Sequence, residues 1–195
     1  MMSAALVVTL ALGVSAAPCD SRVITDAKVL STRLVTAAPA CAESLVASAA
    51  VAIDPAVRLV AADSVQLLSP ARAAAALWLL GEDPTVDVRV AALEASAARC
   101  QRGEGAECVR VLSRFVIDVD DEVSWLARDR LLAIDVDAAL FGAPVAYKVE
   151  AIATLGVMAE RASSPQALHA LEDLALDVDP EVSERAHAAI ARIQP

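Results

Sequence analysis

A short phrase built from aspartate, proline and valine recurs along this chain, each time at the head of an alanine-rich helical segment. It reads Asp-Pro-Ala-Val-Arg from Asp54, Asp-Pro from Asp83, Asp-Asp-Glu-Val from Asp120 and Asp-Pro-Glu-Val from Asp179, with a weaker echo, Ala-Pro-Val, from Ala143. Recurrence at roughly 25–37 residues is typical of proteins in which one helical hairpin is copied and stacked. The phrase predicts an all-α fold, an α-solenoid of stacked antiparallel helix pairs, and it constrains the fold far more than the activity.

The phrase has the chemistry of a helix start. An aspartate at the N-cap accepts a hydrogen bond from the free amides of the first turn, and proline suits the next position because it has no N–H to leave unpaired. The carboxylate also faces the positive end of the helix dipole. We therefore predict that Asp54, Asp83, Asp120 and Asp179 cap four helices.

Three copies of Asp-Val-Asp, at 118–120, 135–137 and 177–179, raise the alternative of calcium binding. A calcium-binding EF-hand loop needs further oxygen ligands, a glycine in mid-loop and a glutamate at its twelfth position. None of the three copies supplies these residues. Helix capping accounts for the aspartates without a metal, and no cofactor is predicted.

The composition agrees with an all-helical protein. Apolar residues make up 57% of the chain, but about a quarter of all residues are alanine, the best helix former, and aromatic residues contribute only 3%. A formal net charge of −10 and an isoelectric point near 4.6 disfavour a nucleic-acid partner, which requires a positive surface. The same charge favours a basic or neutral partner.

Residues 1–16 have the composition of a signal peptide. They carry no charged side chain, are apolar almost throughout from Ala4 to Val14, and end in small residues that fit cleavage after Ala16. The segment is too short to span a bilayer and no longer apolar stretch follows, so no membrane span is predicted. We expect export to the periplasm or the extracellular space. The alternatives are a lipid tether at Cys19, which follows directly, and a buried first helix.

Four cysteines in an exported chain indicate disulfides. Cys100 and Cys108 flank a connector with two glycines, so a bridge there closes a short loop, and we predict it. A straight helix over 21–37 would hold Cys19 and Cys41 far apart, whereas the Cα atoms of a disulfide lie within about 7 Å. That second bridge requires the chain to fold back between the two cysteines, and it is left open.

The chain divides into three parts. The signal peptide is followed by a lead-in helix within 17–41 and then by four to five helix pairs over 42–195. Apolar residues recur at i, i+3, i+4 and i+7 in these segments, as stacked helices require. The fourth pair is predicted to be degenerate, with a short piece at 138–141 before a long helix at 144–161.

Two stretches resemble HEAT repeats, in the short form also found in phycobilisome-lyase-type proteins. They are Asp-Pro-x-Val-Arg followed by Ala-Ala at 54–62, and Asp-x-Asp-Pro-Glu-Val-x-x-x-Ala-x-x-Ala-Ile at 177–190. The resemblance implies a ladder in which the arginine after the valine pairs with aspartates of the neighbouring repeat, and Arg58 and Arg89 match that position. Three residues depart from the pattern and leave the ladder open across the C-terminal half: Ser124, Ala146 and Ser183.

One constellation is a candidate metal site. His169 and Glu172 stand three residues apart, as do Glu184 and His187, on the two helices predicted for the last pair. Such pairs on facing helices hold transition metals in helical bundles. Both histidines, however, lie about 100° from the predicted inward faces. This position favours two surface histidines on a polar flank.

The sequence contains no nucleophile motif, phosphate-binding loop or zinc-protease motif, so we predict that the chain is not an enzyme. Trp125 departs from the apolar stripe of its helix and is either an exposed binding anchor or an aromatic packed against the neighbouring repeat. The candidate contact residues on the row of second helices are Arg58, Arg89, Trp125, Arg128, Lys148 and Arg185.

The leading hypothesis is an exported scaffold or adaptor that binds another protein through a concave row of second helices. The resemblance also implies an alternative, a ligand-handling protein of the phycobilisome-lyase type, which an aromatic or cysteine-lined pocket would favour. A metal-binding module on the last helix pair is a third hypothesis.

Overall fold

The structure is a computed structural model that describes residues 24–104 and 106–193. Within these residues the chain forms eleven α-helices, two short 3-10 helices and no β-strand, which confirms the all-α prediction. The α-helices are α1 (Ala27–Thr36), α2 (Pro39–Ala49), α3 (Pro55–Asp63), α4 (Pro70–Leu80), α5 (Val86–Gln101), α6 (Ala106–Arg114), α7 (Asp121–Leu132), α8 (Val136–Leu140), α9 (Val145–Arg161), α10 (Pro165–Leu174) and α11 (Pro180–Ile193); the 3-10 helices are η1 (Ser64–Leu67) and η2 (Phe115–Ile117).

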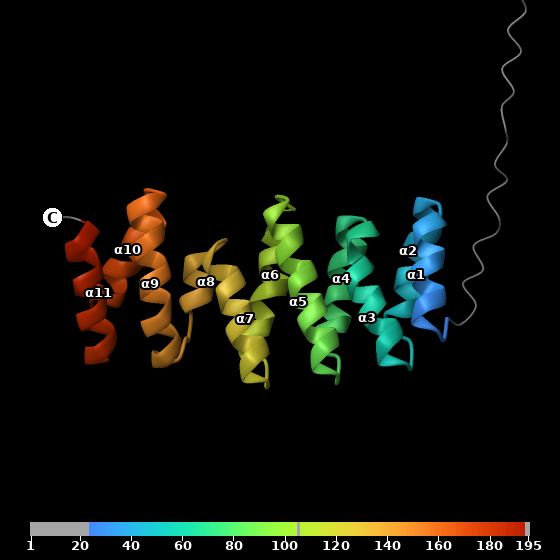
Figure 1. The fold of residues 1–195 in the computed structure, drawn as a ribbon, viewed down its shortest axis with the longest axis horizontal. Helices are drawn as coiled ribbons and strands as arrows, with labels where there is room; N and C mark the ends of the chain where they lie inside the picture. The colour runs from blue at the N-terminus through green and yellow to red at the C-terminus, as the bar shows by residue number, and fades with distance from the viewer. Residues whose placement is uncertain (1–23, 105, 194–195) are drawn as a thin grey trace, which may run out of the picture.

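The helices follow one another in chain order along the long axis of the molecule (Figure 1). After α1 we group them in chain order into five consecutive pairs, numbered one to five: α2 with α3, α4 with α5, α6 with α7, α8 with α9, and α10 with α11. The two helices of a pair pack on each other except in the fourth, where α8 and α9 barely touch. Second helices of successive pairs pack together, α3 on α5, α5 on α7 and α9 on α11, whereas α7 and α9 touch only sparsely. We call α3, α5, α7, α9 and α11 the second-helix row.

Two buried positions recur in every second helix and tie it into the core. The third residue after the N-cap is valine or, once, tyrosine, and the seventh is always alanine. Burying a valine side chain contributes about 1.5–3 kcal/mol, and alanine lets neighbouring helices approach closely. The residues are Val57, Val88, Val123, Tyr147 and Val182 at the first position, and Ala61, Ala92, Ala127, Ala151 and Ala186 at the second, all at most 2% exposed.

The fourth pair departs from the other four. Its first helix, α8, has only five residues and packs mainly against α7. Gly142, with a φ of 58°, then turns the chain into α9, a conformation that glycine adopts without the steric cost of a side chain. Tyr147 takes the place of the recurring valine in this pair, where the short α8 supplies few apolar side chains.

Residues 1–23 lie outside the described part of the chain. The signal peptide and its cleavage after Ala16 therefore remain predictions. The alternative of a lipid tether at Cys19 and the open question of a bridge from Cys19 to Cys41 also involve a residue outside the described part. The first described helix, α1, begins with Asp26 as its N-cap, and α2 begins at Pro39, three residues before the boundary drawn from the sequence. Among the described residues, no helix is long and apolar enough to cross a membrane.

Candidate functional site

The aspartates of the recurring phrase lie in the turns that lead into the second helices. The carboxylate of Asp54 accepts a hydrogen bond from the Ala56 N–H at 2.9 Å. Asp120 and Asp179 each accept from the second and third N–H groups of their helices, at 3.0–3.3 Å. These are N-cap hydrogen bonds, which satisfy amides that the helix itself leaves unpaired.

Asp83 does not cap a helix, and this prediction was wrong. Helix α5 begins at Val86, and its N-cap is Thr85, two residues beyond the aspartate. The Asp83 carboxylate accepts a hydrogen bond from the Thr85 N–H and forms an ion pair with Arg58. Two other aspartates occupy the same place before the N-cap and likewise accept from the N–H two residues on: Asp118 and Asp177.

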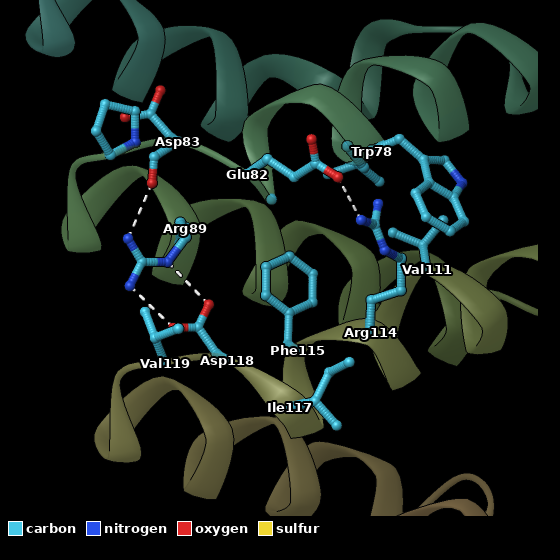
Figure 2. A pocket seen from close by; sticks show the side chains of 13 residues that line it. Trp78, Glu82, Asp83, Arg89, Val111, Arg114, Phe115, Ile117, Asp118 and Val119 are labelled. Atoms are coloured by element: carbon cyan, nitrogen blue, oxygen red, sulfur yellow. Dashed lines mark hydrogen bonds and ion pairs between the residues drawn. The ribbon is translucent and has the colours of Figure 1, made fainter.

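Three ion pairs join neighbouring pairs of helices like the rungs of a ladder. Arg89 of α5 donates from Nε and Nη2 to the two carboxylate oxygens of Asp118, at 2.8 and 2.9 Å (Figure 2). Both side chains are less than a tenth exposed. Such bidentate arginine–carboxylate pairs combine strength with a fixed geometry. The three rungs are Arg58–Asp83, Arg89–Asp118 and Lys148–Asp177.

Burial and pairing act against each other on the rung carboxylates. Burial alone raises the pKa of Asp83, but hydrogen bonds from Arg58 and from a backbone N–H of the turn outweigh it and hold this pKa below its ordinary value. The hydrogen bond from the Lys148 ammonium, helped by a backbone N–H, lowers the pKa of Asp177. Both carboxylates are therefore charged at neutral pH, where they hold their rungs.

The rungs obey a positional rule. The cation stands four residues after the N-cap of one second helix, and its acceptor stands two residues before the N-cap of the following second helix. Between pairs three and four, Ser124 occupies the cation's place and Gly142 the acceptor's, so both partners are missing together. Ala52 holds the acceptor's place in pair one, and Ser183 the cation's place in pair five. The ladder thus consists of two blocks, pairs one to three and pairs four to five, each without an unmatched charge.

Arg128 of α7 connects the two blocks where the rung is missing. Its guanidinium donates at 2.8 Å to the carbonyl oxygen of Ala139, in α8, and at 3.0 Å to that of Phe141, which directly follows α8. It also reaches the carbonyl oxygen of Val116, at 3.3 Å, just before α7. Burial lowers the pKa of Arg128, because its partners are carbonyl dipoles instead of a carboxylate.

Most of the predicted contact residues serve the fold. Four of them are buried or half-buried and are engaged in rungs or with carbonyl oxygens, so they do not face a partner: Arg58, Arg89, Arg128 and Lys148. Arg185 is exposed, and its guanidinium pairs at 2.8 Å with Glu181 one turn earlier in α11. Trp125, the remaining residue of the predicted set, borders an open hollow.

Trp125 is half-buried on the second-helix row. Its ring meets the ring of Tyr147 from α9 edge-on, with the centroids 5.1 Å apart. Tyr147 is 1% exposed, and its hydroxyl has no hydrogen-bond partner among the described residues. Burial and the nearby Asp129 carboxylate raise the pKa of Tyr147, so the phenol stays protonated at neutral pH. The outer side of Trp125 borders an open hollow of about 430 Å³, whose other lining residues are Asp121, Glu122, Leu126 and Asp129.

Acidic and apolar residues alternate on the face that contains Trp125. Positions two, five and nine after the N-cap share one side of a helix, because they stand three and four residues apart. Position five is apolar and half-buried in the first four second helices, and acidic residues flank it most fully in α5 and α7. The three positions are Ala56, Leu59 and Asp63 in α3, Asp87, Val90 and Glu94 in α5, Glu122, Trp125 and Asp129 in α7, and Ala146, Val149 and Ala153 in α9.

A second candidate site opens between pairs two and three, where α4, α6 and the adjoining turns meet (Figure 2). It is a hollow of about 470 Å³ with Trp78 and Phe115 in its lining. The Arg114 guanidinium lies 3.7 Å from the centroid of the Trp78 ring and pairs with Glu82. The charged side chains that line this hollow are thus paired within the protein, and a hollow of this kind suits an uncharged ligand better than an ion.

Large apolar side chains also project singly from the turns before the second helices. They occupy the positions one and three residues before the N-caps of the second helices. Each is at least 81% exposed: Ile53, Ile117, Val119, Phe141, Leu176 and Val178.

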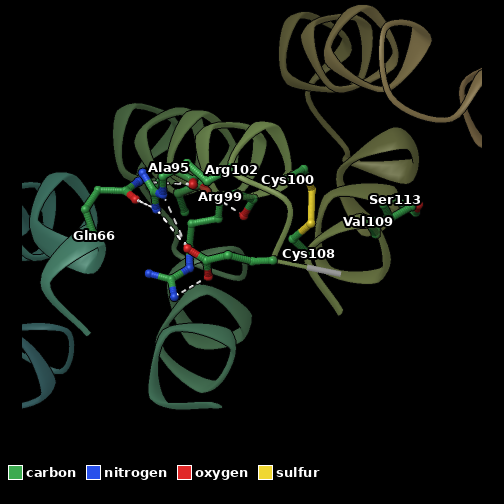
Figure 3. Close-up of a disulfide and its surroundings, with 11 residues drawn as sticks. Gln66, Ala95, Arg99, Cys100, Arg102, Cys108, Val109 and Ser113 are labelled. Atoms are coloured by element: carbon green, nitrogen blue, oxygen red, sulfur yellow. Dashed lines mark hydrogen bonds and ion pairs between the residues drawn. A yellow bond between two sulfur atoms is a disulfide. The ribbon is translucent and has the colours of Figure 1, made fainter. Parts of the chain in front are cut away.

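Cys100 and Cys108 are bridged, with their Cα atoms 5.3 Å apart, as predicted (Figure 3). The bridge closes the connector between α5 and α6. Buried Arg99 strengthens the same place, since it pairs with Glu104 of the connector and donates to the Val65 carbonyl oxygen at 3.0 Å. A further hollow of about 430 Å³ borders Cys108, but a bridged sulfur offers no thiolate to a ligand.

The candidate metal ligands of the last pair are not brought together. His169 lies 3.7 Å from Glu172 and 3.8 Å from Asp173, both on its own helix α10, while Glu184 and His187 lie on α11. No group of three or more His, Cys, Asp or Glu side chains in the described part of the chain is placed to hold a metal ion. The Asp-Val-Asp copies do not supply one either, because five of their six aspartates form rungs or cap helices: Asp118, Asp120, Asp135, Asp177 and Asp179.

The chain has no significant match among models of protein families, curated proteins or solved structures. Function is therefore argued from the surface itself. Two places on that surface offer a site, the face around Trp125 and the hollow beside Trp78.

Proposed function

We propose that this chain is a HEAT-like α-solenoid that acts as a non-enzymatic scaffold or adaptor and binds another protein through its second-helix row. Support for the solenoid comes from repetition at matched positions: the N-cap, the buried residue three places on, the alanine seven places on, and the rungs that join pair one to two, two to three and four to five. In stacked repeats each unit contacts mainly its neighbours, and the helix contacts here follow that order.

The observation that carries the binding proposal is the surface around Trp125. The ring is anchored on one side by Tyr147 and borders an open hollow on the other. Tryptophan is among the residues that contribute most to protein interfaces, because it buries a large apolar area at a small cost in side-chain freedom. A pre-positioned tryptophan at the middle of a repeated apolar row suits a protein partner.

We also propose export to an oxidising compartment, which the composition of residues 1–16 and the Cys100–Cys108 bridge support. Intact-mass analysis of protein from its native cells should give an N-terminus at Ala17 and a mass that rises on reduction. A mass that retains Met1 to Ala16 together with four free thiols would contradict both export and the bridge.

Site-specific photocrosslinking in native cells tests the binding proposal. A benzophenone amino acid at Leu126, beside Trp125, should capture a discrete partner, and one at Leu79, exposed on α4, should not. Trp125→Ala in the Leu126 crosslinking variant should reduce the captured amount at least tenfold, since loss of an interface anchor costs about 2 kcal/mol or more. Capture from Leu79 with none from Leu126 would place the binding surface on the other row and overturn the proposal.

The alternative is a ligand-handling role, and the hollow beside Trp78 favours it. Its size falls in the range of small-molecule sites, and its lining is largely apolar. A bound apolar ligand should quench or shift Trp78 emission and raise the unfolding temperature, and Gly81→Leu, which crowds Phe115 at the hollow, should abolish both effects. Protein purified from native cells without any bound small molecule, and without such shifts on adding apolar compounds, would leave the scaffold proposal alone.

A further inference from the structure

The acidic residues around Trp125 are free to meet a partner's charges. Asp87, Glu122 and Asp129 are exposed, and none of them forms an ion pair within the described part of the chain. Glu94, which occupies the same face of α5, is instead paired with Arg130 of α7 at 2.6 Å. The carboxylates near the row are thus of two kinds: Glu94 joins α5 to α7, whereas Asp87, Glu122 and Asp129 are exposed and form no ion pair within the described residues.

The free carboxylates stand on both sides of an apolar row. Asp87 and Glu122 lie in the first turns of α5 and α7, and Asp129 lies two turns farther along α7. Between them run the half-buried side chains of Val90 and Trp125. The surface therefore offers an apolar strip about one side chain wide, with negative charge along both edges.

The hollow beside Trp125 places carboxylates next to the indole. Asp121, Glu122 and Asp129 line it together with Trp125 and Leu126. A guanidinium paired with the Asp129 carboxylate can stack its flat face on the exposed side of the indole. Carboxylates and indole together favour a cationic side chain at this point.

We propose that the partner presents a cationic amphipathic segment, a helix with an apolar stripe flanked by arginine or lysine, which lies along α5 and α7 with a basic side chain between Trp125 and Asp129. This inference rests on the proposed function and specifies its partner. The protein's net charge of −10 adds long-range attraction for such a segment and repels nucleic acids and anionic lipid surfaces.

Fluorescence anisotropy with a labelled peptide tests the proposal. The probe is an 18-residue leucine–arginine peptide with an amphipathic helical pattern, compared with a scrambled peptide of the same composition and with a leucine–glutamate peptide of the same pattern. The amphipathic basic peptide should bind at least tenfold more tightly than either, and its affinity should fall as salt is raised.

Two matched triple variants separate a specific face from general attraction. Asp87→Asn, Glu122→Gln and Asp129→Asn together should weaken the basic peptide at least tenfold, as should Trp125→Ala alone. Asp137→Asn, Glu172→Gln and Asp173→Asn together make the same change in net charge on exposed residues of α8 and α10, and should change affinity less than twofold. Thermal unfolding checks that all variants remain folded.

Equal weakening by both triple variants, or equal binding of the scrambled peptide, would overturn the proposal, because either result means attraction by net charge alone. These results leave the proposed function intact if Leu126 still captures a native partner. Absence of that capture, with the peptide results as expected, would instead contradict the proposed function and leave the peptide-binding face established.

Discussion

The two blocks of the ladder join their helix pairs through different kinds of ion pair. In pairs one to three, two arginines bind two aspartates through paired, nearly buried hydrogen bonds. In pairs four and five a single lysine, about a quarter exposed, binds Asp177 through one hydrogen bond. Lysine is a flexible point charge, whereas arginine fixes the direction of its partner as well as its distance. The N-terminal block is therefore held more rigidly by its ladder than the C-terminal block is.

The junction between the blocks shows what the rungs are for. Where Ser124 and Gly142 stand in place of a rung, Arg128 donates to backbone carbonyl oxygens at the end of α8 and just after it. Each solution anchors a second helix to the turn that begins the following one. What is retained along the chain is this anchoring and not the identity of the residues that provide it.

The largest effect is expected at the junction itself. Arg128→Ala leaves the Ala139 and Phe141 carbonyl oxygens without the donor that Arg128 supplies, while Val116 keeps its hydrogen bond from Ser124, and the change should lower the free energy of unfolding by about 3–5 kcal/mol. Arg128→Lys keeps the charge but reaches fewer carbonyls, so it should lie between the wild type and Arg128→Ala. Urea unfolding measures both. Equal stability of Arg128→Ala and the wild type would mean that the blocks do not depend on this arginine.

A smaller loss is expected within the N-terminal block. Asp118→Ala leaves the Arg89 guanidinium buried without its carboxylate and should cost roughly 2–4 kcal/mol. Lys148→Ala in the more exposed rung should cost roughly 1 kcal/mol or less. Chemical unfolding of the two variants compares the blocks directly, and a larger loss for Lys148→Ala would reverse the comparison.

Lowering the pH should reduce the contribution of the rungs to stability in both blocks. Because the folded pKa values of Asp83 and Asp177 lie below the unfolded value of about 4, their contribution is fully present above that pH and is lost as pH falls through the folded values. The stability difference between wild type and Asp177→Asn at pH 7 should therefore shrink towards pH 2. A difference that stays constant over this range would show that ionisation of Asp177 does not matter.

The smallest effects concern the backbone beside the junction. Gly142→Ala should cost about 1 kcal/mol, because a side chain is disfavoured at a φ of 58° even though nothing lies near the added Cβ. Ser163→Gly, at a φ of 50° after α9, should stabilise by up to about 1 kcal/mol for the converse reason. Thermal unfolding resolves both signs. A stabilising Gly142→Ala or a destabilising Ser163→Gly would mean that local contacts, and not backbone conformation, determine stability at that position.

Helix starts could be predicted from the sequence because the N-cap acts locally. Asp54, Asp120 and Asp179 cap helices through amides two and three residues away, and the sequence displays that spacing. Asp83 misled the prediction because Asp-Pro is also a good helix start. Its true partner, Arg58, is 25 residues away, and only the fold brings them together.

The contact surface was harder to predict for a related reason. Lys148 was named as a contact residue, although it occupies the rung position for which the resemblance had pointed to Ala146. Arg128 carries no sequence signal for its role, because its acceptors are carbonyl oxygens that every residue possesses. The acidic and apolar rows around Trp125 become visible only when residues are counted from the observed N-caps.

The matched ends of each block have a consequence for how such an array can grow by gene duplication. Pair two is the pair that carries both an acceptor, Asp83, and a donor, Arg89. A copy of it inserted beside the original would therefore extend the ladder and leave no charged rung residue unpaired. A copy of any other single pair would leave one charged residue without a rung partner, because it would face Ala52, Ser124, Gly142 or Ser183. Whole blocks, which begin without an acceptor and end without a donor, can be copied intact. The spacing of charges thus limits which insertions the chain can accept and still fold.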